Sequence, residues 1–342
     1  MRTSSLSGVA AIVLASAFCS LAQAQSPGEF YARKNVRMMV GYGPGTGFDV
    51  YARAVARHMG RHIPGQPNMV VENMPGAGGL TMANYLYNVA PKDGTAIGLV
   101  VNVFMEPLFK NDAVRFDVKK YTWLGSVSRS TPLCFTWHTS GINRFEDVYT
   151  KETLVGGIGR FTDSYLFPQL INDFLGTKFK PVSGYPDSAA VGIAMERGEL
   201  HGFCSFTLAS VKSARPEWLA KKQINILVQL GLTKNLEIPD VPMILDLVKD
   251  HTAKQIMTVM ASNWEAARPV GGPPGIPQDR LDALRKAFMD TMKDPEFLAE
   301  TNKLNIEVDP LDHTAVGKVL DRLYDTPQPV IDRMISIRAK DY

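Results

Sequence analysis

Two glycine-rich segments are the part of this sequence best suited to chemistry, because backbone N–H groups in such segments bind anions. Residues 41–49 read GYGPGTGFD, and residues 73–79 read NMPGAGG. Each segment follows a strand-like run and precedes a helix-like one. N–H groups at the start of a helix, where the helix dipole is positive, form a natural anion site. We therefore predict that the two loops together bind one small oxyanion, such as a carboxylate.

The spacing of these glycines excludes the common nucleotide-binding loops. Counted from Gly41, Gly43 or Gly45, the sixth residue is not glycine, so the dinucleotide pattern G-x-G-x-x-G fails. A P-loop also fails, because neither segment contains Gly-Lys followed by Ser or Thr. The simpler alternative is that the glycines serve only tight turns. Two such loops at successive strand ends weaken that alternative.

The surrounding elements predict an α/β fold. Strand-like and helix-like runs alternate in two series, which indicates parallel sheets covered by helices. In the first series we expect strands at 35–40, 69–72 and 96–103 and helices at 50–62 and 80–89. Later we expect strands at 133–137, 154–158, 202–206 and 256–261 and helices at 164–175, 189–197, 278–293, 295–304 and 314–340. Crossing strands near 131–138 and 256–263 would join two lobes, and a hinged cleft between lobes is a natural ligand site.

The composition is that of a globular protein without a nucleic acid partner. The chain has 342 residues, 45% of them hydrophobic, and no repeat period of about 20 to 50 residues occurs. Its 37 basic residues are interleaved with 34 acidic ones, which leaves a net charge of only +3. No basic block is therefore large enough to hold nucleic acid.

The first 24 residues have the pattern of a secretory signal peptide. Arg2 precedes the apolar run 9–21, and Ala22 and Ala24 form a small-x-small cleavage site. We expect cleavage after Ala24 and export of the mature chain. An uncleaved membrane anchor is the alternative, and it is disfavoured because the run is shorter than the ~20 residues of a bilayer span.

Export would leave Cys134 and Cys204 in a compartment where disulfides persist. The two cysteines allow one bridge, and two buried free thiols are the alternative. A reactive thiol is disfavoured because no base adjoins either cysteine in the sequence.

Residues for metal or covalent chemistry are sparse. His58 and His62 lie four apart on a predicted helix, but no Glu completes an H-E-x-x-H motif and no third ligand is evident. No Gly-x-Ser-x-Gly elbow positions a serine nucleophile. We therefore expect no metal and no cofactor. An exported enzyme that uses the cleft for acid–base chemistry is the alternative to a binding protein.

Several segments together resemble the substrate-binding proteins of tripartite tricarboxylate transporters, also called the Bug family. The resemblance rests on residues 35–53, 70–79 and 90–95, with further similar segments at 238–242 and 293–296. It covers nearly all of the chain that follows the signal peptide.

This resemblance implies a two-lobed periplasmic binding protein of type II, a Venus flytrap with a hinged cleft. Such a protein closes around a small organic carboxylate and delivers it to membrane transporter subunits. We assign residues 25–132 and 259–342 to the first lobe and residues 133–258 to the second. We expect a monomer without catalytic activity, and an orphan binding protein used in signalling is a further alternative.

The resemblance also carries the binding site onto particular residues. In the first lobe they are Tyr42, Gly43, Gly45, Thr46, Gly47, Phe48, Asp49, Pro75, Gly76, Ala77, Gly78 and Asn102. In the second lobe they are Gly159, Arg160, Thr162, Ser164, Tyr185 and Ser205.

Two of these residues depart from the family's usual pattern. Arg160 stands in a loop that is usually small and rich in serine and glycine, and it would pair bidentately with a second carboxylate of the ligand. Phe48 replaces a small polar residue, which favours a ligand with an aromatic or long apolar body. The alternatives are a solvated or ion-paired Arg160 and a core-packed Phe48.

Overall fold

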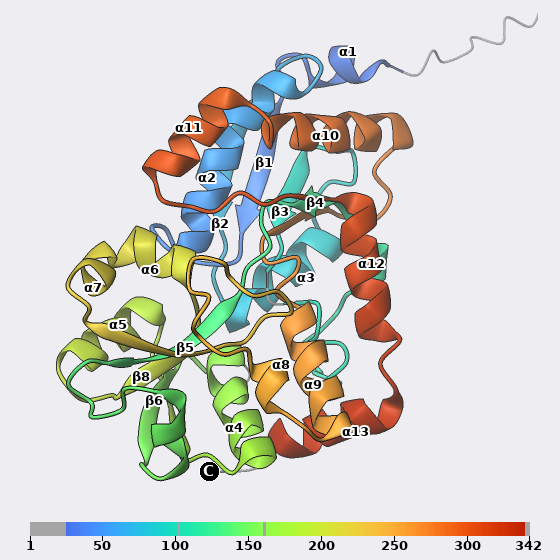
Figure 1. The fold of residues 1–342 in the computed structure, drawn as a ribbon. Helices are drawn as coiled ribbons and strands as arrows, with labels where there is room; N and C mark the ends of the chain where they lie inside the picture. Colours follow the sequence, from blue (N-terminus) through green and yellow to red (C-terminus); the bar gives the residue numbers. More distant parts are fainter. Residues whose placement is uncertain (1–24, 102, 160–161, 339–342) are drawn as a thin grey trace, which may run out of the picture.

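The protein consists of two α/β lobes, each built on its own sheet (Figure 1). The computed structural model describes residues 25–101, 103–159 and 162–338. In Figure 1 the lobe with blue and orange-red elements lies above the lobe with green and yellow elements. The predicted two-lobed α/β fold is thus confirmed. Within the described ranges, no helix combines the length and the apolar character that a membrane span needs.

The first sheet has six strands in the order β11-β4-β10-β3-β1-β2. Their bounds are β1 Asn35–Val40, β2 Asn68–Asn73, β3 Ala96–Leu99, β4 Thr122–Ser126, β10 Pro269–Gly272 and β11 Leu311–Asp312. Strands β1, β2 and β3 are parallel to one another, whereas β10, β4 and β11 pair antiparallel. The segments that follow β1, β2 and β3 therefore emerge at one edge of the sheet, the usual place for a ligand.

Helices on both faces of this sheet bury its side chains. They are α2 Gly47–Met59, α3 Leu80–Asn88, α10 Gln278–Thr291, α11 Pro295–Lys303 and α12 His313–Tyr324. Helix α2 is representative, because Val55 and Met59 lie four residues apart on one face and are fully buried. The short elements are α1 Pro27–Tyr31 and the 3-10 turns η1 Gly60–His62, η2 Ala77–Gly79, η3 Val118–Lys120 and η4 Phe145–Tyr149.

The second sheet has five strands in the order β7-β6-β8-β5-β9. Their bounds are β5 Pro132–Trp137, β6 Thr153–Gly157, β7 Phe179–Ser183, β8 Gly202–Thr207 and β9 Ile224–Gln229. The accompanying helices are α4 Asp163–Leu175, α5 Ser188–Glu196, α6 Leu208–Ala214 and α7 Pro216–Ala220. Every residue of β5 is buried, which explains its continuous apolar sequence.

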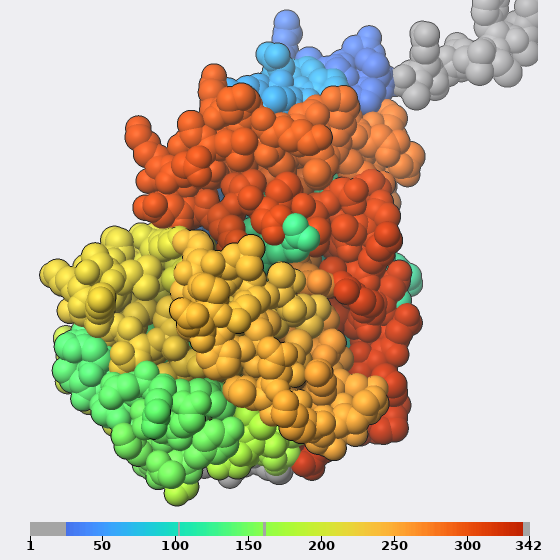
Figure 2. Space-filling view, in the orientation of Figure 1, coloured from blue at the N-terminus to red at the C-terminus, as the bar shows by residue number. Residues whose placement is uncertain are grey.

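The chain passes from the first sheet to the second through residues 127–131. It returns through α8 Ile244–Leu247, α9 His251–Ser262 and the segment 263–268, which leads into β10. In Figure 2 the surfaces of the two lobes meet along a narrow crease. No observation tests the lobe boundaries after residues 132 and 258, which stay a prediction.

The prediction of a strand at 256–261 is wrong, because these residues lie in α9. The helix begins after Asp250, whose side chain accepts a hydrogen bond from Ala253 N (2.7 Å). Its buried face includes Ile256, Met257 and Met260, spaced as a helix requires. The return crossing is consequently made by the extended segment 263–268.

The predicted C-terminal helix at 314–340 is two helices, α12 and α13 Gln328–Arg338. Pro327 separates them, because proline lacks an N–H group and disfavours helical backbone in the preceding residue. After this break α13 packs against α4 of the second lobe and against α9. The C-terminal helix thus links the two lobes.

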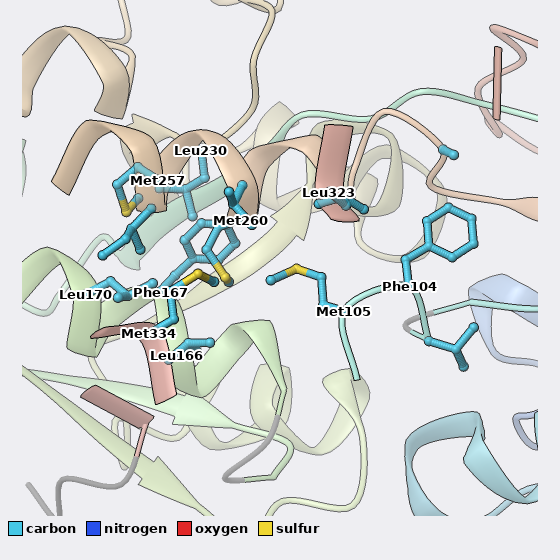
Figure 3. Packing of buried hydrophobic residues seen from close by; sticks show 14 of the residues in the cluster. Phe104, Met105, Leu166, Phe167, Leu170, Leu230, Met257, Met260, Leu323 and Met334 are labelled. Atoms are coloured by element: carbon cyan, nitrogen blue, oxygen red, sulfur yellow. The ribbon is translucent and has the colours of Figure 1, made fainter. Parts of the chain in front are cut away.

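One hydrophobic cluster extends through both lobes. Figure 3 shows Phe104 and Met105, which follow β3, on one side of it, with Phe167 of α4 and Met260 of α9 on the other. Met334 of α13 belongs to the same cluster. The lobes are therefore joined by packed side chains as well as by the crossing segments.

Candidate ligand-binding site

The two glycine loops lie side by side at the carboxyl edge of the first sheet. The Tyr42 hydroxyl donates a hydrogen bond to Gly78 O (2.9 Å). Gly41 approaches Gly79 so closely that a Cβ on Gly41 would lie 2.8 Å from the Gly79 Cα atom. A larger residue at position 41 would therefore push the loops apart.

The first loop leaves two backbone N–H groups free at the start of α2. Thr46 caps the helix: its hydroxyl oxygen accepts from Asp49 N (3.4 Å) and its hydroxyl donates to Gly43 O (2.9 Å). Gly47 N and Phe48 N have no hydrogen-bond partner in the described part of the chain. Both groups lie at the positive end of the helix dipole, where they suit a carboxylate.

Asp49 connects the two loops through hydrogen bonds. Its carboxylate accepts hydrogen bonds from Gly45 N, Arg53 Nε and Asn73 Nδ2, each at 2.8 Å. Burial acts to raise the pKa of Asp49, but the hydrogen bonds from Arg53, Asn73 and Gly45 outweigh it and hold the pKa below its ordinary value. Asp49 is therefore ionised at neutral pH and acts on the site through the loops that it holds.

The second loop has positive φ at four consecutive residues. The values are +141° at Gly76, +47° at Ala77, +64° at Gly78 and +99° at Gly79. Ala77 is the unusual member, because residues with a Cβ rarely adopt this conformation. Pro75 through Gly78 are exposed, and Ala77 N and Gly78 N have no hydrogen-bond partner among the described residues.

Open space borders both loops. A Cβ placed on Gly43, Gly47 or Gly78 would have no described heavy atom within 4 Å. The loops can therefore admit a small molecule without rearrangement. Together with the free N–H groups, this space allows an anion to be held by the backbone.

In the described part of the loop before α4, two hydroxyl groups form hydrogen bonds within the loop. Thr162 Oγ1 donates to Gly159 O (2.8 Å) and lies 2.8 Å from Ser164 Oγ. Ser164 Oγ also accepts from Ile158 N (3.2 Å), and Ser164 is buried. These two hydroxyls therefore shape the loop, and their contact with a ligand stays a prediction.

Two other predicted residues of the second lobe lie at the carboxyl ends of the strands that flank β6, since Tyr185 follows β7 and Ser205 lies near the end of β8, both parallel to β6. Tyr185 packs against the core of its own lobe, and burial raises the pKa of its hydroxyl. Ser205 is a bulged residue of β8 opposite β5, with a φ of +71° that non-glycine residues rarely adopt. Arg160 and Asn102 lie outside the described residues, so their roles stay predictions.

Phe48 has packing partners inside the first lobe. Its ring centroid lies 4.4 Å from that of Tyr42 and 4.6 Å from the guanidinium carbon of Arg268. The ring also packs against the core beneath α2. These contacts account for an aromatic residue at this position without a ligand.

Cys134 and Cys204 form a disulfide between the neighbouring strands β5 and β8. Both residues are at most 1% exposed, so the bond is buried in the second sheet. A bridge in this position serves the stability of the second lobe.

His58 and His62 are held by acids of the α11 region. His58 Nε2 lies 2.6 Å from Glu300 Oε2, and His62 Nε2 lies 2.7 Å from Asp294 Oδ2. In the described ranges no three His, Cys, Asp or Glu side chains are grouped as a metal site would require. The two histidines thus join α2 and the following turn η1 to α11 and its N-cap residue.

The return crossing at 263–268 contributes residues that sequence reasoning missed. Trp264 Nε1 donates to Asp163 Oδ2 at the start of α4 (2.8 Å), which joins the crossing to the second lobe. A cavity of about 10 Å³, room for one water, is lined by Phe104, Asn263, Trp264, Ala266, Ala267 and Pro269. Arg268 is only 5% exposed. The sequence signal that could have predicted its burial is the position of an arginine inside the apolar run 266–270.

The chain is similar in sequence to one curated protein over most of its length. A protein from Cupriavidus necator described as "UPF0065 protein in gbd 5'region" is 24% identical over 302 residues, which are 86% of each chain. The chain matches no family model.

Solved structures with the same fold are periplasmic binding proteins. The binding protein BugD has a TM-score of 0.68 at 18% identity, over 89% of this chain and 98% of that one. A TctC solute-binding protein from Polaromonas has 0.64 at 17%, over 89% and 99%. MatC from Rhodopseudomonas palustris, solved with malate, has 0.62 at 16%, over 89% and 99%. The predicted resemblance is therefore confirmed at the level of the fold.

Proposed function

We propose that this protein is a periplasmic solute-binding protein that captures a small organic carboxylate between its lobes and delivers it to a tripartite tricarboxylate-type transporter. The observation that carries the proposal is the pair of adjacent loops, 43–49 and 75–79, whose free N–H groups border open space at one sheet edge. Backbone donors held in a fixed frame bind a carboxylate without large reorganisation. A solved protein of the same fold with bound malate supports this ligand class.

The proposal includes the division of the chain and its export. The lobes comprise residues 25–132 with 259–342, and residues 133–258, and the signal peptide ends at Ala24. The mature protein is a monomer in the periplasm. N-terminal sequencing of the exported protein and its mass in solution test these statements, and a retained leader or a stable dimer would contradict them.

Ligand identity is tested first on material purified without added acids. Mass spectrometry of the molecules released on unfolding should find a small carboxylate, because a closed cleft retains its cargo. Calorimetry with malate, adipate, 3-hydroxybutanoate and benzoate then measures affinity. Saturable binding to none of them, together with no released acid, would refute the proposal.

A second candidate, an exported enzyme, predicts that the bound acid is consumed. The acids at the helix starts are already engaged, Asp49 by the loops and Asp163 by Trp264. The solved neighbours named above are binding proteins. NMR of the acid after prolonged incubation with protein should find it unchanged, and a converted product would favour the enzyme.

Delivery to a transporter distinguishes a transport protein from an orphan receptor. Uptake of labelled malate by cells or vesicles that carry cognate membrane subunits should require this protein. Binding without any stimulated uptake would favour the signalling alternative.

A further inference from the structure

Arg268 is a buried cation with few protein partners. Its side chain is 5% exposed, its Nη1 donates to Ala267 O (2.8 Å), and its Nε has no hydrogen-bond partner among the described residues. The guanidinium carbon lies 4.6 Å from the Phe48 ring centroid and 5.0 Å from the Tyr51 ring centroid. The aromatic rings hold the guanidinium in place by cation–π contact.

The buried charge of Arg268 is not neutralised by a direct ion pair within the described chain. Burial lowers the pKa of Arg268, while the charge of Glu307 and the hydroxyls of Tyr51 and Tyr42 act in the opposite direction. Glu307 is exposed to solvent and forms no contact with Arg268 within ion-pair distance. An arginine nonetheless stays charged at neutral pH, and a buried charge is costly unless an anion compensates it.

The position of this charge relates it to the anion loops. Phe48, which contacts the guanidinium, is the second residue of α2, and its own N–H group is free. The guanidinium therefore lies beside the helix end where the dipole is already positive. A buried cation next to a positive helix end is unfavourable on its own and becomes favourable when an anion lies in front of the helix.

We propose that Arg268 supplies the fixed positive charge for the ligand carboxylate that binds at the start of α2. This inference rests on the proposed function and sharpens it: Arg268 makes the site select charged acids over their neutral analogues. Because Arg268 and the loops act on the same carboxylate, monocarboxylates and dicarboxylates depend on it equally. A role for Arg160 in holding a second carboxylate would instead affect dicarboxylates alone.

The test compares Arg268→Met with the unchanged protein by calorimetry. Methionine has a similar length and packs well against the rings of Phe48 and Tyr51. The probes are malate, 3-hydroxybutanoate, which lacks one carboxylate, and the neutral 3-hydroxybutanamide. Loss of the charge should weaken both acids by at least about tenfold and leave the amide unchanged. Arg268→Lys should retain more of the acid affinity than Arg268→Met.

Glu307→Gln removes a negative charge instead of a positive one, so it should change the acid affinity in the opposite direction. This variant provides the test if Arg268→Met does not fold. Removal of the negative charge near Arg268 should tighten both acids and leave the amide unaffected. Equal acid affinities in the Arg268→Met and unchanged proteins, or an equal loss for the amide, would overturn the role of Arg268. Acid affinities that stay the same or weaken in Glu307→Gln would do so as well. If the unchanged protein binds neither acid, the same comparison is made with the carboxylate that it releases on unfolding or binds from the panel above, and the absence of any such acid overturns the proposed function itself.

Discussion

The first glycine loop and the loop before α4 share one hydrogen bond and differ in another: in both, a threonine hydroxyl donates to the carbonyl three residues earlier, Thr46 to Gly43 O and Thr162 to Gly159 O. In the first lobe, the N–H groups of Gly47 and Phe48 have no partner among the described residues, and the Asp49 carboxylate accepts a hydrogen bond from Gly45 N of the loop. In the second lobe, the hydroxyls of Thr162 and Ser164 are turned onto their own loop. The two loops therefore differ in the side chain that fixes them, which is the Asp49 carboxylate in the first lobe and the Ser164 hydroxyl in the second.

This difference suggests how the binding work divides. Donors that are fixed before a ligand arrives need no reorganisation, so the first lobe can capture the anion in the open protein. The second lobe can then contribute by excluding water when the lobes close. The second lobe is also the one stapled by a disulfide, which fits a rigid closing element.

The disulfide offers the largest effect on stability. Replacing both cysteines in Cys134→Ala/Cys204→Ala removes a cross-link between residues 70 apart in the sequence. Loop-closure entropy predicts a loss of about 4 kcal/mol in the free energy of unfolding. Because the bond lies inside the second lobe, acid affinity measured well below the melting temperature should stay unchanged. Denaturant unfolding and calorimetry check both statements, and a large loss of affinity would contradict the assignment of capture to the first lobe.

Asp49→Ala should affect both stability and affinity. The substitution leaves Gly45 N and Arg53 Nε without their acceptor and removes one of the two acceptors of Asn73 Nδ2, which should cost about 2 kcal/mol of unfolding free energy. Acid binding should weaken by at least about tenfold, because the two loops are no longer held in a fixed position relative to each other. Asp312→Ala is the matched control: it removes a helix cap on α12, far from the loops in the sequence, and should cost about 1 kcal/mol without changing affinity.

The pH dependence of the Asp49→Ala effect has a definite sign. The folded-state pKa of Asp49 lies below its ordinary value of 3.8, so its contribution is complete above that value. The contribution disappears as the pH falls through the folded-state pKa. The stability difference between Asp49→Ala and the unchanged protein should therefore be constant near neutral pH and shrink in acid. A difference that grows on acidification would show that the carboxylate is not favoured by its partners.

The two glycine loops and their adjacency were predictable from the sequence because the signals for them are local, whereas their role in binding an anion stays a proposal. All the signals lie within the two short segments 35–62 and 68–88: the glycine spacing, the strand before each loop and the helix after it. Their adjacency also follows, since parallel neighbours place their carboxyl ends together. The disulfide remained one of two alternatives, because the pairing of β5 with β8 is not visible in the spacing of Cys134 and Cys204.

The segment 256–268 was misjudged because its decisive interactions are distant in sequence. The run 256–261 is rich in β-branched residues and methionine, and the cap at Asp250 lies outside the run. The position of Arg268 under α2 depends on the return of the chain from the second lobe after more than a hundred residues. No local pattern announces such a contact.

The glycines of the two lobes provide a smaller but sharper test. A Cβ on Gly47 would meet no described heavy atom within 4 Å, and among the described atoms a Cβ on Gly159 would meet a Thr162 methyl group at 3.8 Å and no other. Both Gly47→Ala and Gly159→Ala should therefore fold without loss of stability. Gly47→Ala should weaken acid binding about tenfold, because the methyl group enters the ligand's space, whereas Gly159→Ala should change it by less than about twofold. An equal loss of acid affinity in the two variants, measured by calorimetry, would mean that both lobes bind the anion.

The smallest effect concerns the link between the lobes. Trp264→Phe removes one hydrogen bond to the Asp163 carboxylate and should cost about 1 kcal/mol of unfolding free energy. Because that bond joins the return crossing to the start of α4, its loss should also favour the open form and raise the ligand dissociation rate a few-fold. Trp218→Phe is the matched control, since Trp218 Nε1 donates to Glu196 Oε1 (2.9 Å) within the second lobe. Stopped-flow measurement of the ligand dissociation rate should distinguish the two variants. A similar rate increase in Trp218→Phe would mean that any weakening of the second lobe speeds release, and not the loss of this link in particular.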